Sequence, residues 1–188
     1  MEQRTLKVVV VGDGTVGKTS MLMTYTEGKF PADYVPTIFE NYVGSFHVKG
    51  KSVPYELWDT AGQEDYSHLR PLSYTDTDIV ILCFAVDNQR SFASIEHKWI
   101  EELNRLLPQA RILLVGCKID TRIGFKPGKT KPFITYNQGS ALAKRIKAEG
   151  YMECSALSGE GLREVFTDGL FPLLVKCLKK QKSHCLML

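Results

Sequence analysis

Residues 12–19 read GDGTVGKT, which fits the phosphate-binding pattern G-x-x-x-x-G-K-[ST]. The Val-rich run 6–11 precedes it and predicts a strand, and residues 20–25 follow it and predict a helix. The glycines let the backbone curl so that its N–H groups face phosphate oxygens, and the helix adds the positive end of its dipole. We therefore expect a loop that binds a nucleoside triphosphate, rather than a glycine-rich turn that binds nothing.

The side chains of this loop have separate expected roles. Lys18 should reach the β- and γ-phosphates, and the Thr19 hydroxyl should ligate Mg²⁺. The nucleotide contacts expected from the segment are Gly12, Asp13, Gly14, Thr15, Val16, Gly17, Lys18, Thr19 and Ser20.

A second motif, LWDTAGQ at 57–63, ends the strand-like run 53–58. Asp59 is placed to hold Mg²⁺ through water, and Gly62 allows a backbone N–H to approach the γ-phosphate. The Gln63 side chain both donates and accepts hydrogen bonds, so it can orient an attacking water. Alone, the Asp-Thr-Ala-Gly sequence could be an ordinary turn. After a phosphate loop, it indicates hydrolysis of the triphosphate.

Guanine is predicted as the base of the nucleotide, from the apolar strand 111–117 and the Lys-Ile-Asp that follows it. The Asp120 carboxylate can accept two hydrogen bonds from the guanine edge, whereas adenine offers no such donor pair. The Lys118 stem can lie against the purine face, and the Ala156 N–H can hold the guanine carbonyl oxygen. The base contacts expected here are Cys117, Lys118, Asp120, Ser155, Ala156 and Leu157.

The hydrophobic pattern predicts an α/β fold. Residues 79–86 (IVILCFAV) form a continuous apolar run, typical of a strand buried on both faces. Helices are expected at 91–107, 137–147 and 161–180, the first capped by Ser91 or an adjacent residue and followed by Pro108. This alternation predicts a mostly parallel sheet with helices on both faces and ligands at the carboxyl ends of the strands. With the phosphate loop after its first strand, we expect the sheet to be six-stranded and the fold to be that of a P-loop NTPase.

Composition is typical of a single globular domain. The chain has 188 residues, of which 44% are hydrophobic and 24% charged. No apolar run approaches the roughly 20 residues of a membrane helix, and the charged start MEQRTLK does not resemble a signal peptide. An odd number of cysteines suits reduced cytosolic thiols better than disulfides; they are Cys83, Cys117, Cys154, Cys177 and Cys185.

The excess positive charge lies at the C-terminal end. The net charge is +3, and no acidic residue follows Asp168, whereas Lys176, Lys179, Lys180 and Lys182 do. The chain ends in CLML, a C-a-a-X box whose final Leu favours geranylgeranylation of Cys185. Because one lipid binds weakly, the lysines would supply a second signal for an anionic membrane.

Other interpretations of the tail are open. A frayed, solvated helix end with a chance cysteine would look similar. Nucleic acid is not expected as a partner, because no aromatic residues are interleaved with the lysines. Cys177 could accept palmitate or pack at the end of the last helix, and packing is favoured.

The segments GDGTVGKTS, YVPTIFENY, WDTAGQEDY, CKID and ECSAL resemble small GTPases of the Ras superfamily in order and spacing. Trp58, the segment DYSHLRPL at 65–72 and the long stretch after Asp120 resemble the Rho family. The resemblance implies a G domain over residues 1–175 and a polybasic tail with the prenylation box over 176–188.

The resemblance also implies roles for a first switch at about 30–42 and a second at about 60–74. Phe30 would pack near guanine, Tyr34 would fold over the phosphates, and Thr37 would be a second Mg²⁺ ligand. The implied effector region is Tyr34, Val35, Pro36, Thr37, Ile38, Phe39, Glu40, Asn41 and Tyr42. Its apolar members could instead pack in the core.

Hydrolysis is expected to be slow, with Gln63, Lys18 and Gly14 as the catalytic set. Arg70 and Arg4 are candidates for an internal arginine finger only by residue type, so a GAP should supply an arginine in trans. The implied partners are exchange factors, GAPs, a GDI, effectors and anionic membrane. We expect a monomer on the cytoplasmic face of the plasma membrane, with a cytosolic pool, that controls the actin cytoskeleton.

Three features depart from the family pattern. Ser20 stands where several relatives carry a Cys that reacts with oxidants, so thiol redox control at the phosphate loop is not expected. Cys117 replaces the usual Asn or Thr, and a weak thiol donor should hold the base loop less well and speed nucleotide exchange. The insert at 121–131 is short and contains two Gly and one Pro, so its helix should be reduced or absent. Two other functions are open: a GTP-binding scaffold that barely hydrolyses, and a P-loop kinase for a small metabolite.

Overall fold

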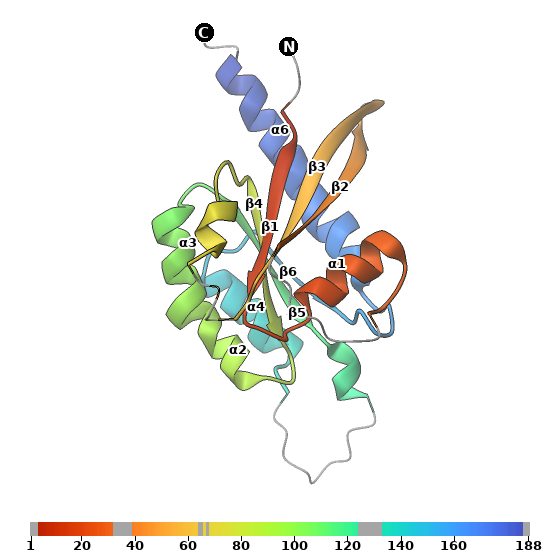
Figure 1. Cartoon of the computed structure of the whole chain (residues 1–188), viewed down its shortest axis with the longest axis vertical. Coiled ribbons are helices and arrows are strands. Elements are labelled where there is room, and N and C mark those ends of the chain that lie inside the picture. Colours follow the sequence, from red (N-terminus) through yellow and green to blue (C-terminus); the bar gives the residue numbers. More distant parts are fainter. Residues whose placement is uncertain (1–3, 32–38, 64–65, 67, 124–132, 186–188) are drawn as a thin grey trace.

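The computed structural model describes residues 4–31, 39–63, 66, 68–123 and 133–185. Its centre is a six-stranded sheet in the order β2-β3-β1-β4-β5-β6 (Figure 1). The strands are β1 Leu6–Gly12, β2 Phe39–Val48, β3 Lys51–Thr60, β4 Ile79–Ala85, β5 Arg111–Cys117 and β6 Gly150–Cys154.

The sheet is mostly parallel, as predicted. Strand β1 pairs in parallel with β3 and β4, and β5 pairs in parallel with β4 and β6. Only the β2–β3 pair is antiparallel among the strands described. The β4 strand is buried at every residue, which explains its uninterrupted apolar sequence.

Helices cover both faces of the sheet (Figure 1). Helix α1 Lys18–Glu27 and the C-terminal helical stretch pack over the face that carries Val8 and Val10. The other face, with Val9 and Val11, is covered by a stretch made of α2 Gln89–Ser94, π-helical η3 Ile95–Trp99 and α3 Ile100–Leu106, and by α4 Tyr136–Arg145. Short 3₁₀ turns lie at η2 Arg70–Ser73 and η4 Ile119–Arg122.

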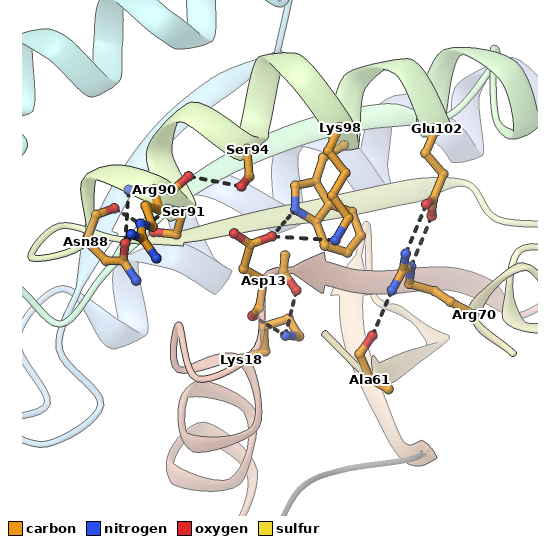
Figure 2. Close-up of polar contacts among 12 residues, drawn as sticks. Asp13, Lys18, Ala61, Arg70, Asn88, Arg90, Ser91, Ser94, Lys98 and Glu102 are labelled. Carbon is orange, nitrogen blue, oxygen red and sulfur yellow. Dashed lines mark hydrogen bonds and ion pairs between the residues drawn. The ribbon is translucent and has the colours of Figure 1, made fainter. Parts of the chain in front are cut away.

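The cap expected at Ser91 or its neighbour is wrong, because Asn88 caps this helix. The Asn88 side chain accepts hydrogen bonds from the N–H groups of Arg90 (3.0 Å) and Ser91 (3.2 Å), so the helix begins at Gln89 (Figure 2). The Ser91 hydroxyl instead accepts from the Ala85 N–H and donates to the Asn88 carbonyl. Helix α4 begins one residue earlier than expected, at Tyr136, because Thr135 and Gln138 form a capping box.

The last helical stretch runs through α5 Leu162–Glu164, π-helical η5 Val165–Leu170 and α6 Phe171–Cys185. Gly161 precedes it with a left-handed φ of 67°, and a Cβ there would lie 2.2 Å from the Glu153 carbonyl oxygen. The stretch ends later than the expected residue 180, so the tail lysines lie within α6. Among the helices described, none is long and apolar enough to cross a membrane.

Candidate nucleotide-binding site

The phosphate loop connects β1 to α1, as its sequence predicts. Gly17 has a left-handed φ of 109° immediately before α1. The buried Lys18 ammonium donates to the carbonyl oxygens of Gly12 (2.8 Å) and Asp13 (2.9 Å), so it lies within the loop (Figure 2). Burial lowers the pKa of Lys18, and the nearby Asp59 carboxylate opposes this shift. The lysine is therefore held where an anionic phosphate would compensate its buried charge.

Gly62 brings the second motif against this loop. A Cβ at Gly62 would lie 2.4 Å from the Lys18 Nζ and 2.5 Å from the Gly12 carbonyl oxygen, so no other residue fits without displacement. A Cβ at Gly14 would lie 3.3 Å from the Gln63 Cγ. The structure thus brings together Lys18, Gly14 and Gln63, the expected catalytic set.

Two of the three expected metal ligands lie together. The Thr19 hydroxyl donates to Asp59 Oδ2 at 2.6 Å, and Asp59 is fully buried at the end of β3. A hydroxyl and a carboxylate are the hard oxygen donors that Mg²⁺ prefers. No group of three His, Cys, Asp or Glu that could hold a metal occurs among the residues described. The oxygen donors of Thr19 and Asp59 fit the donor set of a magnesium ion, and Thr37, the third expected ligand, lies outside the described residues.

The expected base contacts lie at the ends of β5 and β6, which pair in register at Cys117 and Cys154. Lys118 has a left-handed φ of 66°, and its Cγ lies 3.9 Å from the Cβ position of Gly17. The Ser155 hydroxyl donates to Asp120 Oδ1 at 2.5 Å and accepts from the Ser158 N–H at 3.0 Å. The motif alone assigned no partner to Ser155, whereas the structure makes it the group that orients the Asp120 carboxylate.

Cys117 faces two other buried cysteines. Its Cβ lies 3.5 Å from the Cβ position of Gly17, so the end of β5 contacts the phosphate loop. Hydrogen bonding to Cys117 and burial both raise the pKa values of Cys83 and Cys154. The Cys117 side chain thus interacts with thiols on β4 and β6 as well as lying behind the loop.

Neither candidate arginine is available at the phosphates. The Arg70 side chain is fully buried and donates to the Ala61 carbonyl and the Glu102 carboxylate. Arg4 pairs with Asp78, near the opposite end of β1. Cys177 is buried in the core, as the packing interpretation predicts.

Several predicted residues lie outside the described ranges. These are Tyr34, Val35, Pro36, Thr37 and Ile38 of the effector region and most of the insert at 121–131. Phe39, Glu40, Asn41 and Tyr42 form the start of β2, where the Tyr42 hydroxyl donates to Glu40 at 2.6 Å. Phe30 and Leu157 are both exposed, at 46% and 62%.

The sequence did not identify contacts that the phosphate loop makes with the helical stretch α2–α3. The Trp99 indole N–H donates to Asp13 Oδ1 at 2.8 Å, and the Lys98 Nζ lies 3.9 Å from the same oxygen. Both residues belong to a helical pattern in which an apolar Trp indicates only core packing. No local signal could have linked them to a loop more than 80 positions away.

Three features together define a P-loop GTPase. They are the phosphate loop with its lysine, the glycine that brings the second motif against that loop, and the aspartate placed for guanine. Residues 7–172 match the model of the Ras family, and the chain belongs to that family. It is 45% identical to the GTP-binding protein rho5 of Schizosaccharomyces pombe, over 97% of this chain and 96% of that protein. This chain is accordingly a Rho-type small GTPase that binds guanine nucleotide.

Proposed function

We propose that this protein is a regulated molecular switch that hydrolyses GTP slowly and signals from its GTP-bound state. The observation that carries the proposal is the contact of Gly62 with Lys18 and Gly12, which joins the hydrolysis motif to the phosphate loop. A γ-phosphate bound by Lys18 would lie next to the second switch, so its loss would change that segment.

In the proposed hydrolysis, Gln63 orients water for in-line attack on the γ-phosphate. Lys18 and the loop N–H groups stabilise charge on the equatorial and leaving oxygens. Thr19, Asp59 and Thr37 would hold Mg²⁺, which neutralises charge on the β- and γ-phosphate oxygens when it is bound. Gly14 leaves space beside Gln63 for an incoming arginine.

A GAP is proposed to supply the missing arginine. The contacts of the two internal candidate arginines support this proposal. Arg70 is bound to Ala61 and Glu102, and Arg4 is bound to Asp78. An arginine in trans contributes about 10³–10⁵ in rate. Exchange factors, a GDI and effectors that contact residues 34–42 would complete the cycle, with actin organisation as the process controlled.

The test of the switch is the release of fluorescent GDP with Mg²⁺ present, followed by single-turnover GTP hydrolysis on the same sample. We expect slow release and slow but measurable hydrolysis, both accelerated by the matching regulators. Release that outpaces hydrolysis, with no response to a GAP, would instead favour the GTP-loaded scaffold.

Membrane attachment is proposed through a geranylgeranyl group on Cys185 and the lysines of α6. Lys176 donates to Glu149 at 2.7 Å, which partly neutralises it. The attraction to an anionic leaflet would therefore depend mainly on Lys179, Lys180 and Lys182, at about 1 kcal/mol each.

The attachment is tested with prenylated protein and lipid vesicles with and without phosphatidylserine. We expect binding that needs both the lipid and the anionic headgroups. It should fall when Lys179, Lys180 and Lys182 are replaced by Gln, and change little for Lys147→Gln, a control outside the tail. Equal binding to neutral vesicles would contradict the electrostatic part of the proposal.

A further inference from the structure

Arg70, whose side chain is buried, joins the second switch to helix α3 through an ion pair with the half-buried Glu102. Its Nε and Nη2 donate to the two carboxylate oxygens of Glu102, each at 3.0 Å (Figure 2). The Tyr74 hydroxyl donates to the same carboxylate at 2.5 Å. The third donor, Arg70 Nη1, binds the Ala61 carbonyl oxygen at 3.1 Å. A rigid guanidinium thus fixes the backbone directly before Gly62 to a helix of the fold.

The same helical stretch also holds the phosphate loop. The Arg70 guanidinium lies over the Trp99 ring, 4.4 Å from its centre, and the indole N–H of Trp99 donates to Asp13. Trp99 is fully buried and ends the π-helical segment η3. A continuous path of contacts therefore runs from Asp13 through Trp99 and Arg70 to Ala61. Single π turns within helices occur frequently at functional sites.

We infer that Glu102 and Trp99 are positioning residues for GTP hydrolysis. Through Arg70 they fix the Ala61 carbonyl relative to Asp13, and so set where Gly62 and Gln63 lie against the phosphate loop. Glu102 acts through Arg70, whereas Trp99 contacts the phosphate loop at the Asp13 carboxylate. The inference rests on the proposed function, because it explains how Gln63 is held in the position from which it would orient water for hydrolysis.

A purely structural ion pair would behave differently. Its loss would reduce stability and nucleotide affinity together, because the buried guanidinium would lose its partner. Loss of positioning reduces hydrolysis while leaving the bound nucleotide in place. A displacement of about 1 Å can cost on the order of 100-fold in rate.

The test uses Glu102→Gln, which keeps the shape but loses the charge, and Trp99→Phe, which keeps a ring under Arg70 but loses the indole N–H. The matched control is Glu96→Gln, which removes an exposed ion pair with Arg145 from the same helical stretch. For each full-length variant, GDP release, single-turnover GTP hydrolysis and thermal unfolding are measured.

We expect Glu102→Gln and Trp99→Phe to slow hydrolysis about 10- to 100-fold, with GDP release within about twofold of the parent and no such change in Glu96→Gln. Hydrolysis at the control rate, or a parallel loss of affinity and hydrolysis, would overturn the inference. If Glu102→Gln does not fold, Trp99→Phe decides the outcome alone. Failure of the parent protein to hydrolyse GTP would refute the proposed function instead.

Discussion

Gly14 and Gln63 are in contact range across the site, with the Gly14 Cβ position 3.3 Å from the Gln63 Cγ. Gly62 leaves no room for any side chain beside Lys18. At the scale of single residues, the site therefore depends on the missing side chains of Gly14 and Gly62 as much as on the functional groups of Lys18 and Gln63. The sequence predicted the residues of this arrangement from motif spacing, but not the contacts among them.

Gly14→Val and Gln63→Leu should both retain GTP binding and lose GAP-stimulated hydrolysis. Valine at position 14 would push Gln63 aside and occupy the space for the arginine, and leucine at position 63 cannot orient water. Phosphate release with and without a GAP measures this. Unimpaired stimulated turnover in Gln63→Leu would refute its role.

Thr19→Asn should weaken binding of GTP with Mg²⁺ more than binding of GDP, because it removes the hydroxyl that donates to Asp59. Dissociation constants for both nucleotides, with Mg²⁺ and with a chelator, measure the difference. The matched control is Thr24→Asn, the same substitution farther along α1, where the hydroxyl lies 3.5 Å from the Lys29 carbonyl oxygen. An equal loss for both nucleotides in Thr19→Asn would count against Thr19 as a ligand.

Cys117→Asn should slow GDP release, because an amide donates stronger hydrogen bonds to the phosphate loop than a thiol does. The comparison is Cys83→Ser, which changes the neighbouring thiol on β4. The off-rate of a fluorescent GDP is the measurement, and an unchanged rate in Cys117→Asn would show that the thiol does not limit affinity.

At the scale of elements, the strands were predicted more accurately than the helix ends. The β5 strand was expected at 111–117 and lies at Arg111–Cys117, because a short continuous apolar run is typical of a strand buried in a parallel sheet. The start of α2 was misplaced because Asn88 and Ser91 are both good capping residues, and only their contacts distinguish them, with Ser91 bonded to Ala85 and Asn88 to Arg90. The π-helical segments left no pattern from which they could be predicted.

Asn88→Ala should destabilise the folded state by about 1 kcal/mol, the usual cost of losing a helix cap. Ser94→Ala, which removes only an exposed bond to the Arg90 carbonyl, should have a much smaller effect (Figure 2). Urea unfolding of the GDP-bound protein measures both. Equal stabilities for the two variants would show that Asn88 does not limit the start of the helix.

At the scale of the whole molecule, the sequence predicted the sheet, its two helical layers and the edge where the motifs meet. It could not predict the ties between layers, such as Arg70 to Glu102 and Trp99 to Asp13, since these join residues far apart in the chain. Such ties depend on how the helices pack, which local patterns do not encode.

One of these ties should make stability depend on pH. Burial alone would raise the pKa of Glu102, but hydrogen bonds from Arg70 and Tyr74 outweigh it, so the pKa is lowered in the folded state. The unfolded pKa is about 4.3, so the contribution is present above that pH and is lost as pH falls through the folded pKa. We expect the stability of Glu102→Gln to fall less steeply than that of the parent below about pH 4.3. Parallel curves from unfolding at several pH values would contradict this.

The sheet gives the molecule two poles. Strand β1 begins, and α6 ends, at one pole, whereas β1, β3, β5 and β6 deliver their motifs to the other (Figure 1). The fifteen residues of α6 span about 22 Å. Under the proposed attachment, the end of this helix would face the bilayer, and the nucleotide pole would lie at the end of the sheet away from it. An exchange factor or a GAP could then approach from the solvent side without displacing lipid.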